Sequence, residues 1–301
     1  MSTLISRAKT VAFQGESGAY ANLAAREALP WAEAVAAPTF EAAVASVRTR
    51  QTDLAIIPVE NSLYGRIADV HQLMRFFGRA VKGYVPPAGA KAGLFILGEH
   101  FFRVRHQLLG VKGAKLSDVK TVFSQAPALG QCRKEIKELG LVDKQWSDTA
   151  GAARHVAEMG DKTCAAIASS LAGETYGLEV LKPDIEDASN NMTRFLVVGP
   201  EPDDPPNDGR PVITTLLFRV RNVPAALYKA LGGFATNDVN VTKLESYQLG
   251  GSFNATEFYA DLEGHPDAPN VHLALEELQF FCSKLTVVGI YPAHPYRSEM
   301  P

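Results

Sequence analysis

The sequence predicts an α/β protein in which a largely parallel sheet is followed by a smaller, separate βαββαβ unit. Two observations predict this fold class. Over the first two thirds of the chain, short apolar segments alternate with helical segments of roughly 10 to 15 residues, the pattern that produces parallel sheets. A proline-rich stretch at 199–211 then interrupts the alternation, and a different order of elements follows it.

The first part begins with an apolar strand, a glycine turn and an alanine-rich helix. The expected strands are 10–14, 54–57, 92–97, 119–123 and 165–168, and the expected helices are 19–29, 40–50, 128–139, 148–160 and one that ends at 177. Ligands of such sheets bind at the carboxyl ends of the strands, so polar residues there are the first candidates for a site.

The part after the proline-rich stretch predicts a ferredoxin-like unit. Its expected strands are 212–220, 239–249, 252–262 and 284–291, and its expected helices are 224–236 and 270–281. A Gly-Gly pair at 250–251 predicts the hairpin turn. The unit is small and shows no catalytic cluster, so a ligand-sensing or dimerising role is expected.

Length, charge and cysteine usage narrow the class of protein. With 301 residues and a formal net charge of −3, the chain predicts about two domains and no binding of nucleic acid or acidic membranes. No apolar run approaches a membrane span, and no secretory signal is expected. The three cysteines are far apart and the histidines lack ligand spacing, so we expect no metal and a cytoplasmic location.

A hydroxyl and a permanent cation stand side by side in Thr193-Arg194-Phe195, just before an apolar run. Arginine can hold a carboxylate, and a threonine hydroxyl can donate a hydrogen bond to a leaving oxygen. The alternative is an ordinary edge-strand threonine beside a solvated arginine.

Four further polar clusters follow expected strands. Gly15 and Gly18 join a strand to a helix, where backbone N–H groups can hold an anion, although a plain tight turn has the same sequence. Each of the other clusters suits either a binding site or a helix cap; they contain Glu60, Asn61 and Ser62, then Ser124 with Gln131, and then Thr149. No nucleophile stands beside a base, and this set suits binding a small dicarboxylate without a covalent intermediate.

Taken together, the clusters resemble those of the prephenate dehydratases, and the last part resembles the ACT domains that bind amino acids. The resemblance covers about 10–290. The matching motifs are Phe13-Gln14-Gly15 with Gly18-Ala19-Tyr20, Val59-Glu60-Asn61-Ser62, the segment 124–132, Asp148-Thr149-Ala150, Ala165-Ala166-Ile167-Ala168-Ser169, Tyr176-Gly177-Leu178, and Asn191 with Thr193-Arg194-Phe195.

The resemblance implies a fold and domain boundaries. The catalytic domain would be 1–200, with two subdomains like those of type II periplasmic binding proteins. One subdomain would be about 1–86 with 187–200, and the other 87–186. A linker at 201–211, an ACT domain at 212–291 and a tail at 292–301 would follow.

The resemblance also implies a reaction, the loss of CO2 and water from prephenate to give phenylpyruvate, with no cofactor. Thr193 would act on the departing ring hydroxyl and Arg194 would hold a substrate carboxylate. Four further catalytic residues would line the pocket, namely Glu60, Asn61, Ser124 and Gln131. The implied substrate-binding residues are Gly15, Gly18, Ser62, Thr149 and Phe195.

For the ACT part, the resemblance implies phenylalanine as an effector and a homodimer or homotetramer. The implied effector-binding residues are Ala225, Ala226, Leu227, Asn237, Asn240, Glu245 and Ser246. The sequence departs from the family pattern at Gln125, where histidine is usual, and at Tyr247 and Gln248, where arginine and proline are usual. The remaining alternatives are an arogenate dehydratase and a non-catalytic amino-acid-binding regulator.

Overall fold

The computed structural model describes residues 2–80, 93–249 and 252–299, which divide into two compact units. Unit 1 comprises Met1–Ala8, His71–Glu99 and Leu196–Pro301, and unit 2 comprises Lys9–Val70 and His100–Phe195. These units cut the chain at other positions than the domain boundaries expected from the sequence. The chain passes from one unit to the other within three elements, namely α4 (Ala68–Leu73), β6 (Phe95–Arg103) and β12 (Met192–Gly199).

The first sheet of unit 2 has the strand order β12-β3-β1-β2. Its further elements are β1 (Thr10–Gln14), α2 (Tyr20–Ala28), β2 (Glu33–Ala37), α3 (Phe40–Arg48), β3 (Leu54–Asn61) and β4 (Gly65–Arg66). β1 pairs in parallel with both β2 and β3, which confirms the predicted alternation of strands and helices. The helix-cap alternative for the cluster of Asn61 and Ser62 does not hold, because β3 continues to Asn61 and turns back into β4.

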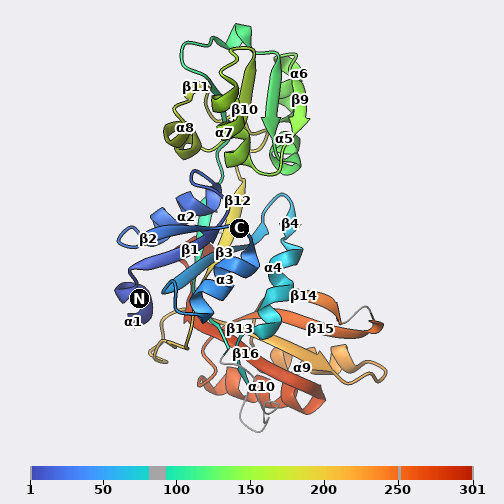
Figure 1. Ribbon diagram of the computed structural model, residues 1–301. Coiled ribbons are helices and arrows are strands. Elements are labelled where there is room, and N and C mark those ends of the chain that lie inside the picture. Colours follow the sequence, from blue (N-terminus) through green and yellow to red (C-terminus); the bar gives the residue numbers. More distant parts are fainter. Residues whose placement is uncertain (1, 81–92, 250–251, 300–301) are drawn as a thin grey trace. The chain divides into compact units, whose positions relative to one another are not determined.

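The second sheet of unit 2 has the order β11-β7-β10-β8-β9 and is drawn in green in Figure 1. Its elements are β7 (Gln107–Gly110), η2 (Leu116–Asp118), β8 (Thr121–Ser124), α5 (Ala126–Gln131), α6 (Arg133–Glu138), β9 (Val142–Gln145), α7 (Thr149–Met159), β10 (Cys164–Ala168), α8 (Ser170–Tyr176) and β11 (Glu179–Lys182). The expected single helix at 128–139 is two helices, because Cys132 leaves the helical region with φ −117° and ψ 23°. Asp148 caps α7, since its Oδ1 accepts from the Gly151 N–H at 2.7 Å, and this confirms the predicted start of the helix at 148.

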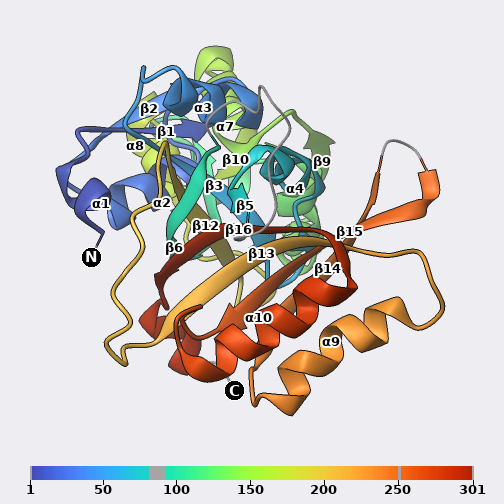
Figure 2. The same cartoon turned by 90° about the horizontal axis from the view of Figure 1, so that it is seen from below.

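The C-terminal part of unit 1 confirms the predicted βαββαβ order. Its elements are β13 (Val212–Val220), α9 (Ala226–Thr236), β14 (Val241–Leu249), β15 (Ser252–Glu263), α10 (Pro269–Phe281) and β16 (Cys282–Pro292). The antiparallel strands lie in the order β14-β15-β13-β16, and both helices cover one face of the sheet (Figure 2). Leu216, Phe218, Phe234 and Leu278 belong to the core between sheet and helices.

The rest of unit 1 consists of short elements, namely α1 (Thr3–Arg7), η1 (Met74–Phe76), β5 (Arg79–Ala80) and η3 (Pro295–Ser298). The proline-rich segment contains no helix or strand, as expected, but it is held in place. Asp203 accepts from the Ser2 hydroxyl at 2.5 Å and from the Leu4 N–H at 2.7 Å. This segment therefore packs as part of unit 1.

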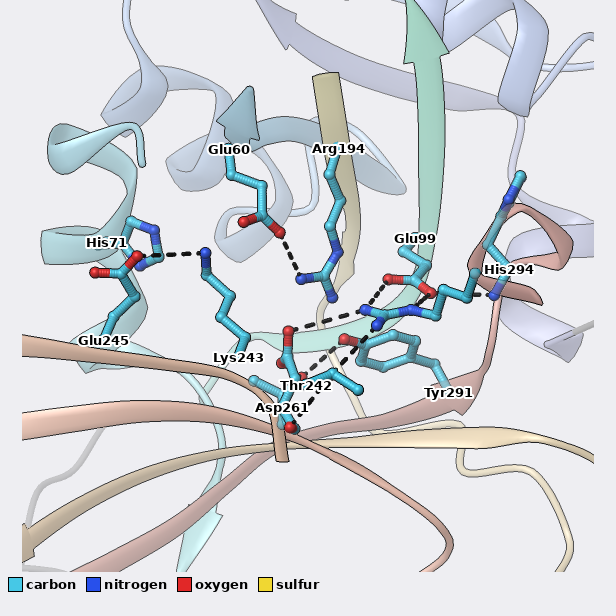
Figure 3. A network of polar contacts seen from close by, with 12 residues as sticks. Glu60, His71, Glu99, Arg194, Thr242, Lys243, Glu245, Asp261, Tyr291 and His294 are labelled. Atoms are coloured by element: carbon cyan, nitrogen blue, oxygen red, sulfur yellow. Dashed lines mark hydrogen bonds and ion pairs between the residues drawn. The ribbon is translucent and has the colours of Figure 1, made fainter. Parts of the chain in front are cut away.

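Unit 1 also encloses a group of charges, which we call the Glu99 cluster (Glu99, Asp261 and Arg297). Arg297 donates to both carboxylate oxygens of Glu99, at 2.6 and 2.9 Å, and lies 3.9 Å from Asp261. Both carboxylate side chains are 0% exposed. Figure 3 shows the contacts, which attach the C-terminal η3 segment to β6 and β15.

Candidate active site

Unit 2 contains a cavity of about 490 Å³. Its walls come from the β1–α2 loop, β3, the β6–β7 connection, α5, the start of α7 and β12. Six of the residues singled out in the sequence line it, namely Gly15, Asn61, Gln131, Thr149, Thr193 and Phe195. Five others are not among the lining residues, namely Gly18, Glu60, Ser62, Ser124 and Arg194.

Thr193 and Asn61 form the centre of the polar wall. The Asn61 Nδ2 donates to Thr193 Oγ1 at 3.0 Å and to Asn191 Oδ1 at 2.8 Å, while its Oδ1 accepts the backbone N–H groups of Leu63 and Tyr64. These bonds fix the Asn61 amide in one orientation. Because Thr193 Oγ1 already accepts from Asn61, its own hydrogen can be donated to a ligand in the cavity.

Arg194 lies on the other face of β12, because successive side chains of a strand point to opposite faces. Its Nη1 donates to Glu60 Oε1 at 3.0 Å, and its side chain is 2% exposed (Figure 3). The structure thus brings the two expected catalytic residues together as an ion pair between the buried Arg194 and the partly exposed Glu60, and neither is among the lining residues.

Three of the other expected residues bond or pack elsewhere in unit 2. The Ser124 hydroxyl is buried and donates to the Ile167 carbonyl at 2.7 Å. Ser62 Oγ donates to the Asn190 carbonyl and accepts from the Met192 N–H, which ties the β3–β4 turn to β12. Gly18 donates its N–H to Asn22, and a Cβ at Gly18 would lie 2.7 Å from the Ala172 Cα. The Gly18 N–H is therefore already hydrogen-bonded to the first turn of α2.

The lining also includes polar residues that were not assigned a role from the sequence, among them Tyr20, Tyr64 and His106. Tyr20 stands within a quoted motif, whereas nothing around His106 in the sequence marks it. Tyr64 is 53% exposed, donates to the Pro127 carbonyl at 3.0 Å and lies against Gly130. It therefore joins the β3–β4 turn to α5 across the cavity.

His106 is the buried titratable group of this wall. Its pKa is lowered from the ordinary value, because burial disfavours the charged imidazole. A hydrogen bond with Gln131 and the charge of Glu186 raise the pKa, but burial is the larger effect. Burial likewise raises the pKa of the Tyr20 hydroxyl well above its ordinary value. Both directions favour the neutral forms of His106 and Tyr20 near neutral pH.

Unit 1 contains a second cavity of about 300 Å³ at the start of α9. It is lined by Ala225, Ala226, Leu227 and Phe258. Phe258 of β15 lies opposite Ser246 of the neighbouring strand β14. The remaining effector candidates make hydrogen bonds or ion pairs with their neighbours: Asn237 with Glu277, Asn240 with Glu263, and Glu245 with Lys243.

Neither a metal-binding cluster nor a membrane-spanning helix occurs among the described residues. They contain no group of three or more histidine, cysteine, aspartate or glutamate side chains that could share a metal ion. None of the described helices is long and apolar enough to cross a membrane.

Comparisons with known proteins agree on one family. The family model described as prephenate dehydratase matches residues 11–203. A Komagataeibacter europaeus protein named bifunctional N-acyl-homoserine lactone acylase/prephenate dehydratase is 47% identical, over 97% of this chain and 98% of its own. Arogenate dehydratase 2 of Petunia hybrida is 36% identical, over 94% of this chain and 71% of its own. The structure of an Arthrobacter aurescens prephenate dehydratase in complex with L-Phe matches with a TM-score of 0.82 at 26% identity, over 97% and 92%.

Proposed function

The chain belongs to the prephenate dehydratase family, and we propose that it converts prephenate into phenylpyruvate, CO2 and water in the cavity of unit 2. The observation that carries the proposal is the Thr193 hydroxyl, whose oxygen accepts from Asn61 while its hydrogen is available to the cavity. A donor fixed in this way can stabilise charge that develops on a leaving oxygen.

The reaction asks for little covalent chemistry from the protein. Prephenate loses its ring carboxylate as CO2 and its ring hydroxyl as water, and the ring becomes aromatic, which drives the reaction. The protein has to orient the substrate and assist departure of the hydroxyl, and holding reacting groups in place lowers the barrier. Phe195 and Pro58 supply apolar surface for the ring, and Gln131 and Thr149 supply polar groups.

The test is to follow phenylpyruvate from prephenate, and phenylalanine from arogenate, with purified protein at pH 8. Arogenate is the second candidate substrate because several relatives are named arogenate dehydratases, and it carries an ammonium group that Asp69 or Asp148 of the lining could accept. We expect turnover of prephenate that is lost in Thr193→Ala. Turnover of arogenate alone would move the assignment to that reaction.

A second activity, hydrolysis of N-acyl-homoserine lactones, is favoured by the name of the 47% identical relative. The test is to incubate the protein with lactones of several chain lengths and detect homoserine lactone by mass spectrometry. No release at any chain length would restrict the proposal to the dehydratase reaction.

For unit 1 we propose phenylalanine as an effector that binds at the cavity beside Ala225, Ala226 and Leu227. The Arthrobacter aurescens relative, whose structure holds L-Phe, supports this choice. Titration calorimetry with phenylalanine, tyrosine and tryptophan tests it, and light scattering tests the proposed homodimer or homotetramer. Binding without turnover of any substrate would instead favour the non-catalytic regulator.

A further inference from the structure

The cavity wall of unit 2 contains a chain of three hydrogen-bonded side chains, Tyr20, His106 and Gln131. The Tyr20 hydroxyl lies 2.7 Å from His106 Nδ1, and His106 Nε2 lies 2.6 Å from Gln131 Oε1. All three residues line the cavity, and His106 is 2% exposed. The imidazole therefore makes its hydrogen bonds inside the protein, on the boundary of the cavity.

This chain can hold the imidazole either neutral or protonated. Gln131 Oε1 only accepts, so Nε2 carries a hydrogen in both states. In the neutral state Nδ1 accepts from the Tyr20 hydroxyl. In the protonated state Nδ1 donates to the Tyr20 oxygen, and the Tyr20 hydrogen turns to the Arg105 carbonyl at 3.0 Å. The change requires rotation of one hydroxyl group and leaves no polar group without a partner.

The charged and titratable groups around His106 are few. Tyr20 of α2 faces Nδ1, and Cys132 follows Gln131 at the end of α5. Glu186, between β11 and β12, accepts the His106 backbone N–H at 2.9 Å. Arg105 is held 3.2 Å from Asp184. Glu186 is the nearby carboxylate that favours a protonated imidazole, and burial opposes protonation.

The charges of the cavity lining indicate a role for His106 as a cation. Among the described residues, the lining includes Asp69 and Asp148 but neither lysine nor arginine. A dicarboxylate such as prephenate brings two negative charges beside the imidazole, and negative charges within about 4–6 Å favour the protonated form. His106 is the described lining residue that can become a cation when such a ligand binds.

We propose that His106 takes up a proton when the dicarboxylate substrate binds and delivers it through Tyr20 to the leaving hydroxyl; the inference rests on the dehydratase function proposed above. As the ring C–O bond breaks, the Tyr20 hydroxyl turns from the Arg105 carbonyl to the departing oxygen, which keeps the electron pair and takes the Tyr20 proton to form water. Tyr20 Oη takes the proton from His106 Nδ1. The bond to the ring carboxylate breaks, its electron pair enters the ring, and CO2 leaves. His106 is then neutral and takes its next proton from solvent.

The first test is the pH dependence of kcat in His106→Gln, which keeps an amide hydrogen-bonding group but cannot be protonated. Because the protonated form is active, kcat of the wild type should be constant at lower pH and fall about tenfold per pH unit above the pKa of the complex. We expect His106→Gln to lose this alkaline limb and to be on the order of 10²-fold slower at pH 7. His155→Gln is the matched control, because His155 stacks on Trp146 and is not among the lining residues.

The second test measures proton uptake directly. Prephenate is titrated into Thr193→Ala at pH 8 in buffers of different ionisation enthalpy, since this variant is expected to bind without turnover. We expect uptake of close to one proton per site, and none in Thr193→Ala/His106→Gln. If the His106 variant does not fold, Tyr20→Phe serves instead, with normal proton uptake and a kcat lowered on the order of 10²-fold.

Three outcomes would overturn the inference. An alkaline limb that survives in His106→Gln would leave His106 a structural residue, and so would a zero proton uptake with tight binding. A Tyr20→Phe variant with wild-type kcat would remove the relay. These outcomes leave the dehydratase function intact, whereas a wild-type protein that consumes neither prephenate nor arogenate would overturn both proposals.

Discussion

The cavity of unit 2 and the Glu99 cluster of unit 1 use buried polar groups in opposite ways. In the Glu99 cluster, one guanidinium pairs with two buried carboxylates and holds the η3 segment. In the cavity, the polar wall centres on the neutral groups of Asn61, Thr193, Gln131 and His106, with hydrogens directed by their neighbours. Under the proposed function, directed neutral donors and not buried ion pairs therefore distinguish the active-site cavity from the Glu99 cluster.

Strand β12 shows the same division within three residues. Thr193 and Phe195 line the cavity, while Arg194 between them belongs to an ion pair with Glu60. If the comparison holds, substitutions on the cavity face reduce turnover, and substitutions of the buried charges reduce stability.

The largest expected effect is that of Thr193→Ala on kcat. Removing a preorganised donor to a developing oxyanion costs about 10²–10³-fold. Thr193→Ser keeps the hydroxyl and should remain within about tenfold of the wild type. Steady-state kinetics with prephenate measures both variants. A Thr193→Ala variant with near-native kcat and an unchanged unfolding midpoint would remove Thr193 from the mechanism.

The next largest effect is expected from Arg297→Ala in unit 1. The variant leaves Glu99, whose side chain is fully buried, without its bidentate partner, and breaking such a pair costs about 3–5 kcal/mol of unfolding free energy. Urea unfolding measures the loss. Arg210→Ala is the control, because the Arg210–Asp208 pair is exposed and such pairs contribute little. Equal losses in the two variants would contradict the role given to the Glu99 cluster.

Arg194→Leu sharpens the comparison on β12. We expect a loss of about 1–3 kcal/mol in stability, because the hydrogen bond and ion pair between Arg194 and Glu60 are removed, and a change in kcat of less than about tenfold. Phe195→Ala, on the cavity face, should raise KM more than Arg194→Leu does. Steady-state kinetics with prephenate and the unfolding midpoint are measured for both variants. A loss of activity in Arg194→Leu equal to that of Thr193→Ala would instead support the expected contact between Arg194 and a substrate carboxylate.

The smallest effect concerns pH and the half-exposed pair of Glu16 and Arg154. The hydrogen bond and charge of Arg154 hold the pKa of Glu16 below its ordinary value of 4.5. The stabilisation is therefore present above pH 4.5 and is lost as the pH falls through the lower folded-state pKa. Thermal unfolding of Glu16→Gln should show a shallower decline than the wild type below pH 4.5, and parallel declines would contradict this account.

The sequence predicted the order of elements well, because alternating strands and helices depend on local hydrophobic patterns. It did not predict the two faces of β12, since residues 193–198 are all buried and a strand buried on both sides carries no alternation. His106 was missed because its partners Tyr20 and Gln131 lie 86 and 25 residues away in the sequence. Contacts of this kind are decided by tertiary packing.

The Tyr64 contact has a kinetic consequence. A single hydrogen bond to the Pro127 carbonyl attaches this exposed ring to the opposite wall, and such a bond contributes about 1 kcal/mol, a factor of about five in an equilibrium. Side chains and loops of this kind move within nanoseconds to microseconds. Opening of the Tyr64 contact would then be far faster than a typical enzyme turns over, which is about 10 per second. Under the proposed function, opening of this contact would therefore not limit the rate of turnover.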